Sequence, residues 1–159
     1  LWKLGFKRKI INQGYCDGAI NIIKADIFWK FEGFDQDFFF YCEETDFCKR
    51  LRDHDFNIVV DQKALAIHDR GGSSTKGKRN QKYYLKLLVN SQFLYLKKHS
   101  SHTKTRVFKW FQILHNKKME YVYLIFHVVF SYFKINKYKI KRTHFKTVSK
   151  LYLKYKIGR

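Results

Sequence analysis

The 159-residue sequence contains no proline, only three cysteines and, in its second half, almost no acidic residues. The absence of proline excludes a proline-rich linker between domains. Cys16, Cys42 and Cys48 are odd in number and lack a Cys-x-x-Cys spacing, which argues against a disulfide framework and against a zinc site. We therefore expect reduced thiols, as in a cytosolic protein.

The charge is divided unequally along the chain. Residues 1–69 contain 10 Lys or Arg and 12 Asp or Glu, a net charge of −2. Residues 70–159 contain 23 Lys or Arg and one acid, Glu120, a net charge of +22, which accounts for the total of +20. This asymmetry indicates an anionic partner for the second half, such as membrane phosphates, phosphorylated lipid or nucleic acid; the alternative is a solvated basic surface.

Residues 33–52 are the most informative stretch. They place five carboxylates among six Phe and Tyr side chains and then become basic. A solvated acidic loop would not be interleaved with so many aromatic rings, and buried carboxylates must be paired or bound to something. This pattern is typical of a site in which a carboxylate is held in place and partly desolvated.

This stretch resembles the C-terminal half of the catalytic domain of family 2 glycosyltransferases, especially the bacterial rhamnosyltransferase-like branch. The family pattern reads approximately G-G-F-D-E-x-F-F-x-Y-x-E-D-x-D-L-x-x-R. The matching residues here are Gly33, Phe34, Asp35, Phe38, Phe39, Tyr41, Glu43, Glu44, Asp46, Phe47 and Arg50. The sequence departs from the pattern at Gln36, Glu44 and Phe47, and a later Arg-Asn pair of the family is Val89-Asn90 here.

The resemblance implies an inverting transfer of a sugar from a nucleotide-diphosphate donor to a hydroxyl of a cell-surface polysaccharide or lipid-linked acceptor. Glu44 would be the catalytic base, and Glu43 and Asp46 would shape the acceptor site. Helix N-capping is the alternative role for these three acids. The acceptor-binding residues that the resemblance implies are Asp17, Gly18, Ala19, Phe39 and Tyr41.

A second motif follows at residue 68. His68 begins a His-x-x-Gly-x-Ser run that includes Gly71 and Ser73. By resemblance, His68 contacts a divalent cation, Mn²⁺ or Mg²⁺, at the donor diphosphate, and Arg70, Gly71 and Ser73 belong to a donor-phosphate loop. Residues 69–80 form either a lid over the donor or a flexible connection.

The resemblance covers residues 14–98. The nucleotide-binding half of such an enzyme would precede Leu1, and the sequence begins without Met or a signal-peptide pattern. We therefore expect a fragment that binds nucleotide sugar poorly and turns over little by itself. The implied fold is α/β, a partial GT-A fold in which a short mixed sheet with flanking helices is followed by a basic helical tail.

Local patterns predict the individual elements. Strands are expected at residues 19–23, 57–60 and 64–67, and residues 1–13 are expected to be an irregular connection. Helices are expected at residues 25–32, 43–54 and 81–98. In the last of these, the apolar side is predicted to comprise Tyr84, Leu87, Leu88, Ser91, Leu94 and Tyr95.

Residues 101–159 are predicted to form a separate basic, aromatic tail with about three helical pieces, after a first domain at residues 1–100. Residues 119–133 are apolar on nearly all sides but shorter than the roughly 20 residues that cross a bilayer. Flanked by Lys and Arg, they are typical of an interfacial helix on anionic lipid or of a buried helix.

We expect a cytoplasmic protein, peripheral at the inner face of the bacterial membrane. The alternatives are a nucleic-acid-binding module, with Trp110 and other rings stacking on bases, and an inactive remnant of a disrupted gene.

Overall fold

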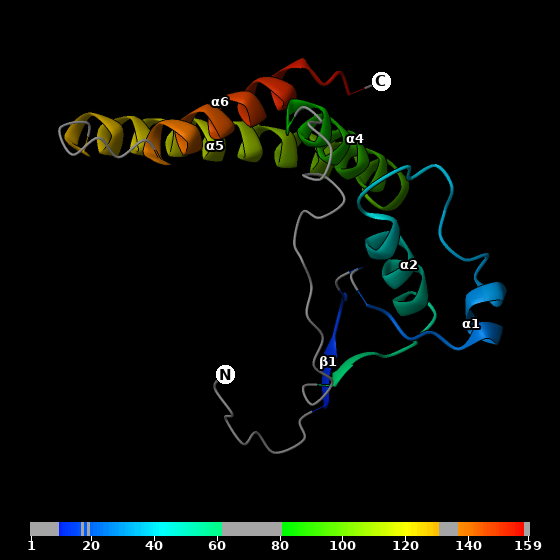
Figure 1. Cartoon of the computed structure of the whole chain (residues 1–159). Helices are drawn as coiled ribbons and strands as arrows, with labels where there is room; N and C mark the ends of the chain where they lie inside the picture. The colour runs from blue at the N-terminus through cyan, green and yellow to red at the C-terminus, as the bar shows by residue number, and fades with distance from the viewer. Residues whose placement is uncertain (1–9, 17, 19, 62–80, 131–136, 158–159) are drawn as a thin grey trace, which may run out of the picture. The chain divides into compact units, whose positions relative to one another are not determined.

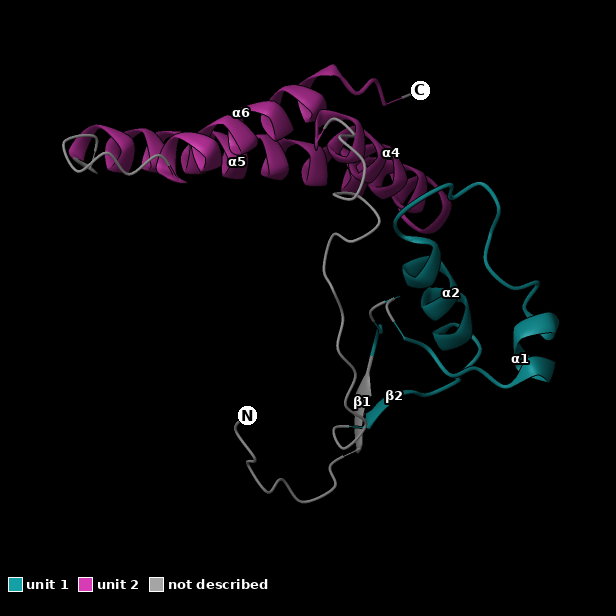
Figure 2. Cartoon of the chain, in the orientation of Figure 1, with its two compact units in different colours: residues 1–79 teal, residues 80–159 magenta. Residues whose placement is uncertain are grey.

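The computed structural model describes residues 10–16, 18, 20–61, 81–130 and 137–157. The chain divides into two compact units, Leu1–Arg79 and Asn80–Arg159 (Figure 2). The sequence predicted a division between residues 100 and 101. In the structure, the helix that precedes this point groups with the later helices.

The described part of the first unit contains one pair of strands, both of which are labelled in Figure 2. Strand β1, Ile10–Gln13, pairs antiparallel with β2, Ile58–Asp61, with Ile10 opposite Asp61 and Gln13 opposite Ile58. The prediction of a strand at residues 57–60 is confirmed to within one residue. The expectation of an irregular connection is wrong at β1, where two consecutive β-branched isoleucines favour extended backbone.

Two helices follow β1 in the first unit, as expected: α1, Ala25–Lys30, and α2, Glu43–Arg52. After α1, the chain turns through Glu32 and Gly33, which have positive φ angles of 58° and 63°. A Cβ atom on Gly33 would lie 2.8 Å from Cζ of the Phe28 ring, so this turn requires glycine. The α2 sequence places acids in the first turn and bases in the last, the order that the helix dipole favours.

Aromatic rings hold α1 against α2. Phe47 of α2 is almost fully buried, and its ring centroid lies 5.6 Å from that of Phe28 and 5.5 Å from that of Phe34. Phe31, the residue after α1, packs edge-on against Phe56 with ring centroids 5.3 Å apart. The aromatic residues of this stretch are therefore the core of the first unit, and they support the start of α2.

The second unit consists of α4, Gln81–His99, α5, His102–Phe130, and α6, Lys137–Lys154 (Figure 1). Its core comprises Val89 and Phe93 of α4, Ile113 of α5 and Tyr152 of α6. The helix predicted at residues 81–98 is confirmed. The helix predicted to begin at residue 119 is the second half of α5, which begins at His102.

The predicted α/β, partial GT-A fold is wrong. Outside the β1–β2 pair, the described residues form helices and connections, and no mixed sheet flanked by helices is present among them. Residues 20–23, expected to be a strand, are not in a strand, and Ile22 is 99% exposed, so it has no sheet to pack on. The strand expected at residues 64–67 lies outside the described residues.

None of the helices within the described residues is long and apolar enough to span a membrane.

Candidate functional site

The start of α2 has an unusual backbone. Tyr41 and Cys42, the two residues before the helix, have positive φ angles of 70° and 69°. Non-glycine residues rarely adopt this left-handed conformation, and two in succession cost free energy that the surrounding structure must offset. Cys42 is the N-cap residue, yet its side chain makes no capping hydrogen bond. The strained turn directs the chain so that α2 begins with Glu43 and Glu44.

Glu44 lies against a segment from another part of the sequence. A Cβ atom placed on Gly18 would be 3.3 Å from Cγ and 3.4 Å from Cδ of Glu44. The structure therefore brings together the predicted base and one of the predicted acceptor-binding residues, in a contact so close that a side chain at residue 18 would press on Glu44. The other two residues of that segment, Asp17 and Ala19, lie outside the described residues.

Glu43 points a carboxylate oxygen into the protein. Its Oε2 atom is buried and has no hydrogen-bond partner among the described residues. The pKa of the Cys42 thiol is raised to about 11. Burial is the largest cause, and the negative charges of Glu44 and Glu43 add to it. Two carboxylates and one thiol thus share a small, partly desolvated region at the start of α2.

Asp46 has a different environment from the other two acids. It is 1% exposed, and its Oδ2 accepts a hydrogen bond from Nε of Arg50 at 2.8 Å. The remaining nitrogens of Arg50 donate to the carbonyl oxygen of Phe31 and, at 2.7 Å, to that of Gly33. Asp46 therefore orients the arginine that holds the end of α1 against α2. We assign it a positioning role within the first unit.

The two aromatic residues predicted to bind acceptor differ in exposure. Phe39 is 79% exposed, whereas Tyr41 is half-buried and packs edge-on against Phe40 with ring centroids 4.5 Å apart. Phe39 therefore presents an apolar ring to solvent, three residues before the N-cap of α2. The exposed ring of Phe39 is accessible to a ligand, whereas Tyr41 forms part of the strained turn.

The sequence analysis did not predict that two thiols, one of them on α2, lie close together. Sγ of Cys16 lies 3.5 Å from Sγ of Cys48 on α2, and all three cysteines are free. Burial raises the pKa of the Cys16 thiol to about 12, with further contributions from Cys48 and Glu44. The spacing of the two cysteines in the sequence carries no signal for this contact, because tertiary folding alone brings them together.

The predicted metal and donor-phosphate residues, His68, Arg70, Gly71 and Ser73, lie outside the described residues. Among the residues that are described, no group of three or more His, Cys, Asp or Glu side chains could hold a metal ion. The convergence of Glu44 and His68 on one pocket stays a prediction.

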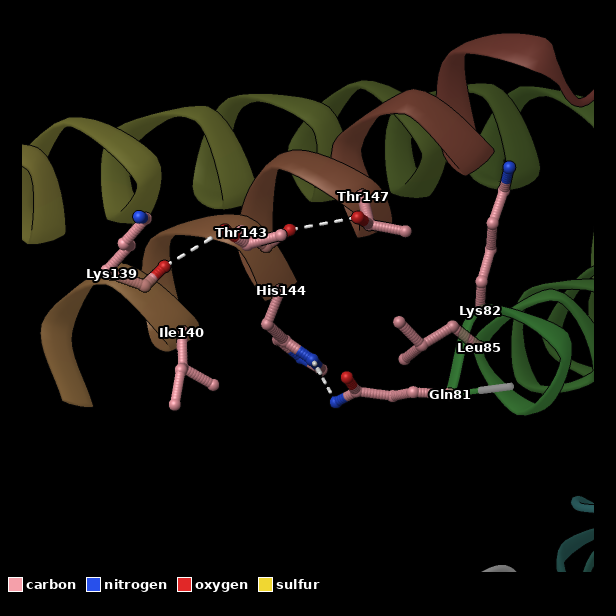
Figure 3. Close-up of a pocket in the computed structure, with 8 residues that line it drawn as sticks. All are labelled: Gln81, Lys82, Leu85, Lys139, Ile140, Thr143, His144 and Thr147. Atoms are coloured by element: carbon pink, nitrogen blue, oxygen red, sulfur yellow. Dashed lines mark hydrogen bonds between the residues drawn. The ribbon is translucent and has the colours of Figure 1, made fainter. Parts of the chain in front are cut away.

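A pocket of about 390 Å³ lies within the second unit, between α4 and α6 (Figure 3). Its lining residues are Gln81, Lys82, Leu85, Lys139, Ile140, Thr143, His144 and Thr147. The two threonine hydroxyls donate to carbonyl oxygens of their own helix, and His144 lies 3.5 Å from the amide of Gln81. No carboxylate or thiol lines this pocket, so it lacks the acid–base groups that the start of α2 provides.

Comparison with known proteins supplies no relative. No family model, curated protein or solved structure matches the chain. A functional assignment therefore depends on the chemistry of the residues around Glu44.

The raised pKa of Cys42 predicts slow alkylation of the folded protein. A thiol of ordinary pKa, about 8.5, is roughly one-quarter thiolate at pH 8, whereas a pKa of about 11 leaves roughly one thiolate in a thousand. We expect iodoacetamide to modify Cys42 about two orders of magnitude more slowly in the native protein than in urea at pH 8. Peptide mass spectrometry measures both rates.

The same pKa determines the sign of the pH dependence. Between pH 8.5 and 11 the native protein retains a proton that the unfolded chain loses, so this thiol's contribution to stability falls as the pH rises through that range. The native alkylation rate should increase about tenfold per pH unit up to about pH 11. Equal rates in buffer and urea at pH 8 would contradict the environment described for Cys42.

Proposed function

We propose that the start of α2 is the acceptor side of a glycosyltransferase site, with Glu44 as the catalytic base. The observation that carries this proposal is the contact of the Glu44 side chain with Gly18, at the first turn of a helix entered through two strained residues. Strained backbone conformations are concentrated at functional sites. They persist where the surrounding packing holds a side chain in a fixed orientation.

The environment of Glu44 suits proton abstraction. In the first turn of a helix, backbone N–H groups favour an ionised carboxylate, the form that accepts a proton. Glu44 is half-buried, so it is partly shielded from water while a ligand can still reach it. The exposed Phe39 offers an apolar surface for a sugar ring.

The proposed reaction is a single displacement. Glu44 accepts the proton of the acceptor hydroxyl while the hydroxyl oxygen forms a bond to the anomeric carbon of the donor sugar. The bond from that carbon to the diphosphate oxygen breaks at the same time, and the nucleoside diphosphate leaves with the electron pair. Attack opposite the leaving group inverts the anomeric carbon.

Other groups complete the proposal on the donor side. A bound divalent cation, Mn²⁺ or Mg²⁺, would supply positive charge at the leaving diphosphate, with His68 as its proposed ligand and Arg70, Gly71 and Ser73 as proposed phosphate contacts. The acceptor would be a cell-surface polysaccharide or a lipid-linked glycan, and the protein would act at the inner face of the bacterial membrane. These assignments extend the resemblance of residues 14–98 to family 2 glycosyltransferases.

The first test replaces the proposed base. In the complete translation product that contains this sequence, Glu44→Gln should lower kcat for sugar transfer by about 10²- to 10⁴-fold, because a positioned base contributes a factor of that order. The KM for acceptor should change little, since the amide keeps the size of the carboxylate. The measurement is release of nucleoside diphosphate from a panel of nucleotide hexoses in the presence of glycan acceptors.

The matched control is Asp53→Asn, which neutralises an exposed carboxylate at the opposite end of the same helix. This variant should retain full activity. A Glu44→Gln enzyme as active as the Asp53→Asn enzyme would disprove the role of Glu44. Failure of the unsubstituted protein to release nucleoside diphosphate from any donor in the panel would disprove the proposed function.

A further inference from the structure

Helix α5 carries an apolar stripe that is exposed along most of its length. The side chains recur at steps of three, four or seven residues, the spacing of one helical face. Each of them is between 58% and 67% exposed. The stripe consists of Val107, Trp110, Phe111, Leu114, Tyr121, Ile125, Val128 and Val129. At about 1.5 Å per residue, it extends for roughly 33 Å.

The opposite face of α5 already packs within the second unit. Thr105, Ile113, Asn116 and Glu120 are buried there, and Ile113 belongs to the core shared with α4 and α6. Near the other end, the ring of Tyr123 stacks on Phe145 of α6 at 5.4 Å (Figure 1 shows the two helices side by side). The exposed stripe is therefore additional to the apolar face that folding requires. An exposed apolar face of this length indicates an interaction site.

The charges around the stripe are almost all positive. Residues 80–159 contain 19 Lys or Arg and one acid. That acid, Glu120, is buried and forms an ion pair with Lys117 at 3.6 Å. Lys118 is exposed and lies within the stripe, one turn from Leu114 and Tyr121, and Lys104 and Arg106 are exposed at its beginning. A partner for this face must accept both apolar side chains and many cations.

We propose that the α5 stripe docks the protein on the surface of an anionic lipid bilayer. The helix would lie in the plane of the interface, with the stripe among the acyl chains and the lysines directed to lipid phosphates. The exposed Lys118 within the stripe suits a helix that lies at the interface, because its long side chain can reach the lipid phosphates while the neighbouring rings stay among the acyl chains. The inference rests on the second unit alone and does not depend on the function proposed for α2.

Two other occupants fit the surface less well. A second copy of the chain could cover the stripe, but it would bring together two surfaces that are both strongly cationic and lack acids to pair with. A nucleic acid would neutralise the lysines through its phosphates, yet a duplex offers no apolar phase for eight exposed hydrophobic side chains. An anionic bilayer satisfies both features.

The test measures partition onto lipid vesicles. The protein should sediment with vesicles of phosphatidylcholine containing 30% phosphatidylglycerol, and much less with phosphatidylcholine alone or at 0.5 M salt. In a variant that carries Trp2→Phe and Trp29→Phe, the fluorescence of Trp110 should shift to the blue and be quenched by brominated acyl chains. Quenching reports insertion of the stripe itself, which electrostatic adsorption alone would not produce.

The double variant Phe111→Asp with Ile125→Asp should weaken the partition at least about tenfold, because it places two charges on the apolar face. Both side chains are exposed, so the circular dichroism spectrum should be unchanged. Ile22→Asp, on a residue that is 99% exposed in the first unit, is the matched control and should bind like the unsubstituted protein.

Three results would overturn the inference. They are binding of the double variant equal to that of the control; a dimer in the absence of lipid that the double variant dissociates; and steeply salt-dependent binding to a DNA or RNA duplex without binding to anionic vesicles.

Discussion

Arg50→Met should lower the free energy of unfolding of the first unit by about 3–5 kcal/mol, the usual cost of removing one partner from a buried ion pair. Asp46 is 1% exposed, and without the guanidinium its carboxylate would be a buried charge with its ion-pair partner removed. The substitution also removes the donors to the carbonyl oxygens of Phe31 and Gly33, which join the end of α1 to α2. Hydrogen exchange of α1 and α2 during urea titration measures the loss.

Lys49→Met is the control, because Lys49 pairs with Asp53 at the same spacing on the same helix. These side chains are 32% and 48% exposed, so water screens the pair and we expect a change below about 1 kcal/mol. Arg50→Lys should recover only part of the stability, since an ammonium group cannot reproduce the planar set of donors that reaches three acceptors. Equal effects at Arg50 and Lys49 would show that Asp46 and Arg50 are not the structural pair described here.

Phe93→Ala should destabilise the second unit by about 3–5 kcal/mol, the range for removing a large aromatic side chain from a core. The Phe93 side chain is 1% exposed, and its ring stacks on Tyr155 with centroids 3.8 Å apart. It also packs against Tyr152 and Phe108, so its removal opens a cavity between α4, α5 and α6. Urea unfolding followed by near-ultraviolet circular dichroism, together with hydrogen exchange of α4, measures the change.

Phe111→Ala provides the contrast, since the same side chain is removed from the exposed stripe of α5. Stability should change by less than about 0.5 kcal/mol. A large loss for Phe111→Ala would mean that the stripe is covered in solution by other parts of the chain. A small loss for Phe93→Ala would place the core of the second unit elsewhere.

Local pattern was sufficient to predict α2 and α4. The acids from Glu43 to Asp46, followed by bases at Lys49 to Arg52, predicted α2 with its first residue correct, because capping and dipole effects act within one turn. The continuous helical spacing after residue 80 likewise predicted α4. Both signals come from neighbours along the chain, and tertiary context does not reverse them.

Packing within those helices was predicted less well. The apolar side expected for α4 included Ser91 but omitted Val89 and Phe93, which are the most deeply buried of its side chains. Spacing defines a face only approximately, and the partner helices select which part of it becomes the core. Residues 119–133 were interpreted as apolar on nearly all sides, whereas α5, which begins at His102 and contains the first part of this range, exposes one stripe and buries the opposite face.

The site was predicted in part. The sequence singled out Glu43, Glu44 and Asp46 together, and the (i, i+4) spacing of Asp46 and Arg50 could have indicated their ion pair. The contact of Glu44 with Gly18 and the approach of Cys16 to Cys48 join residues far apart in the chain. The fold class was wrong because Ile20 to Ile23 have the composition of a strand but no neighbouring strand among the described residues.

The amino-acid sequence by itself determined the positions of α1, α2 and α4, the basic character of residues 70–159 and the choice of acids at the start of α2. Each of these depends on composition or on neighbours within one or two turns. The tertiary structure alone decided that Asp46 is buried against Arg50, that Glu44 faces Gly18 and that one apolar face of α5 stays exposed. Burial and contact are properties of residues that the folded chain brings together from distant positions, so no local pattern specifies them.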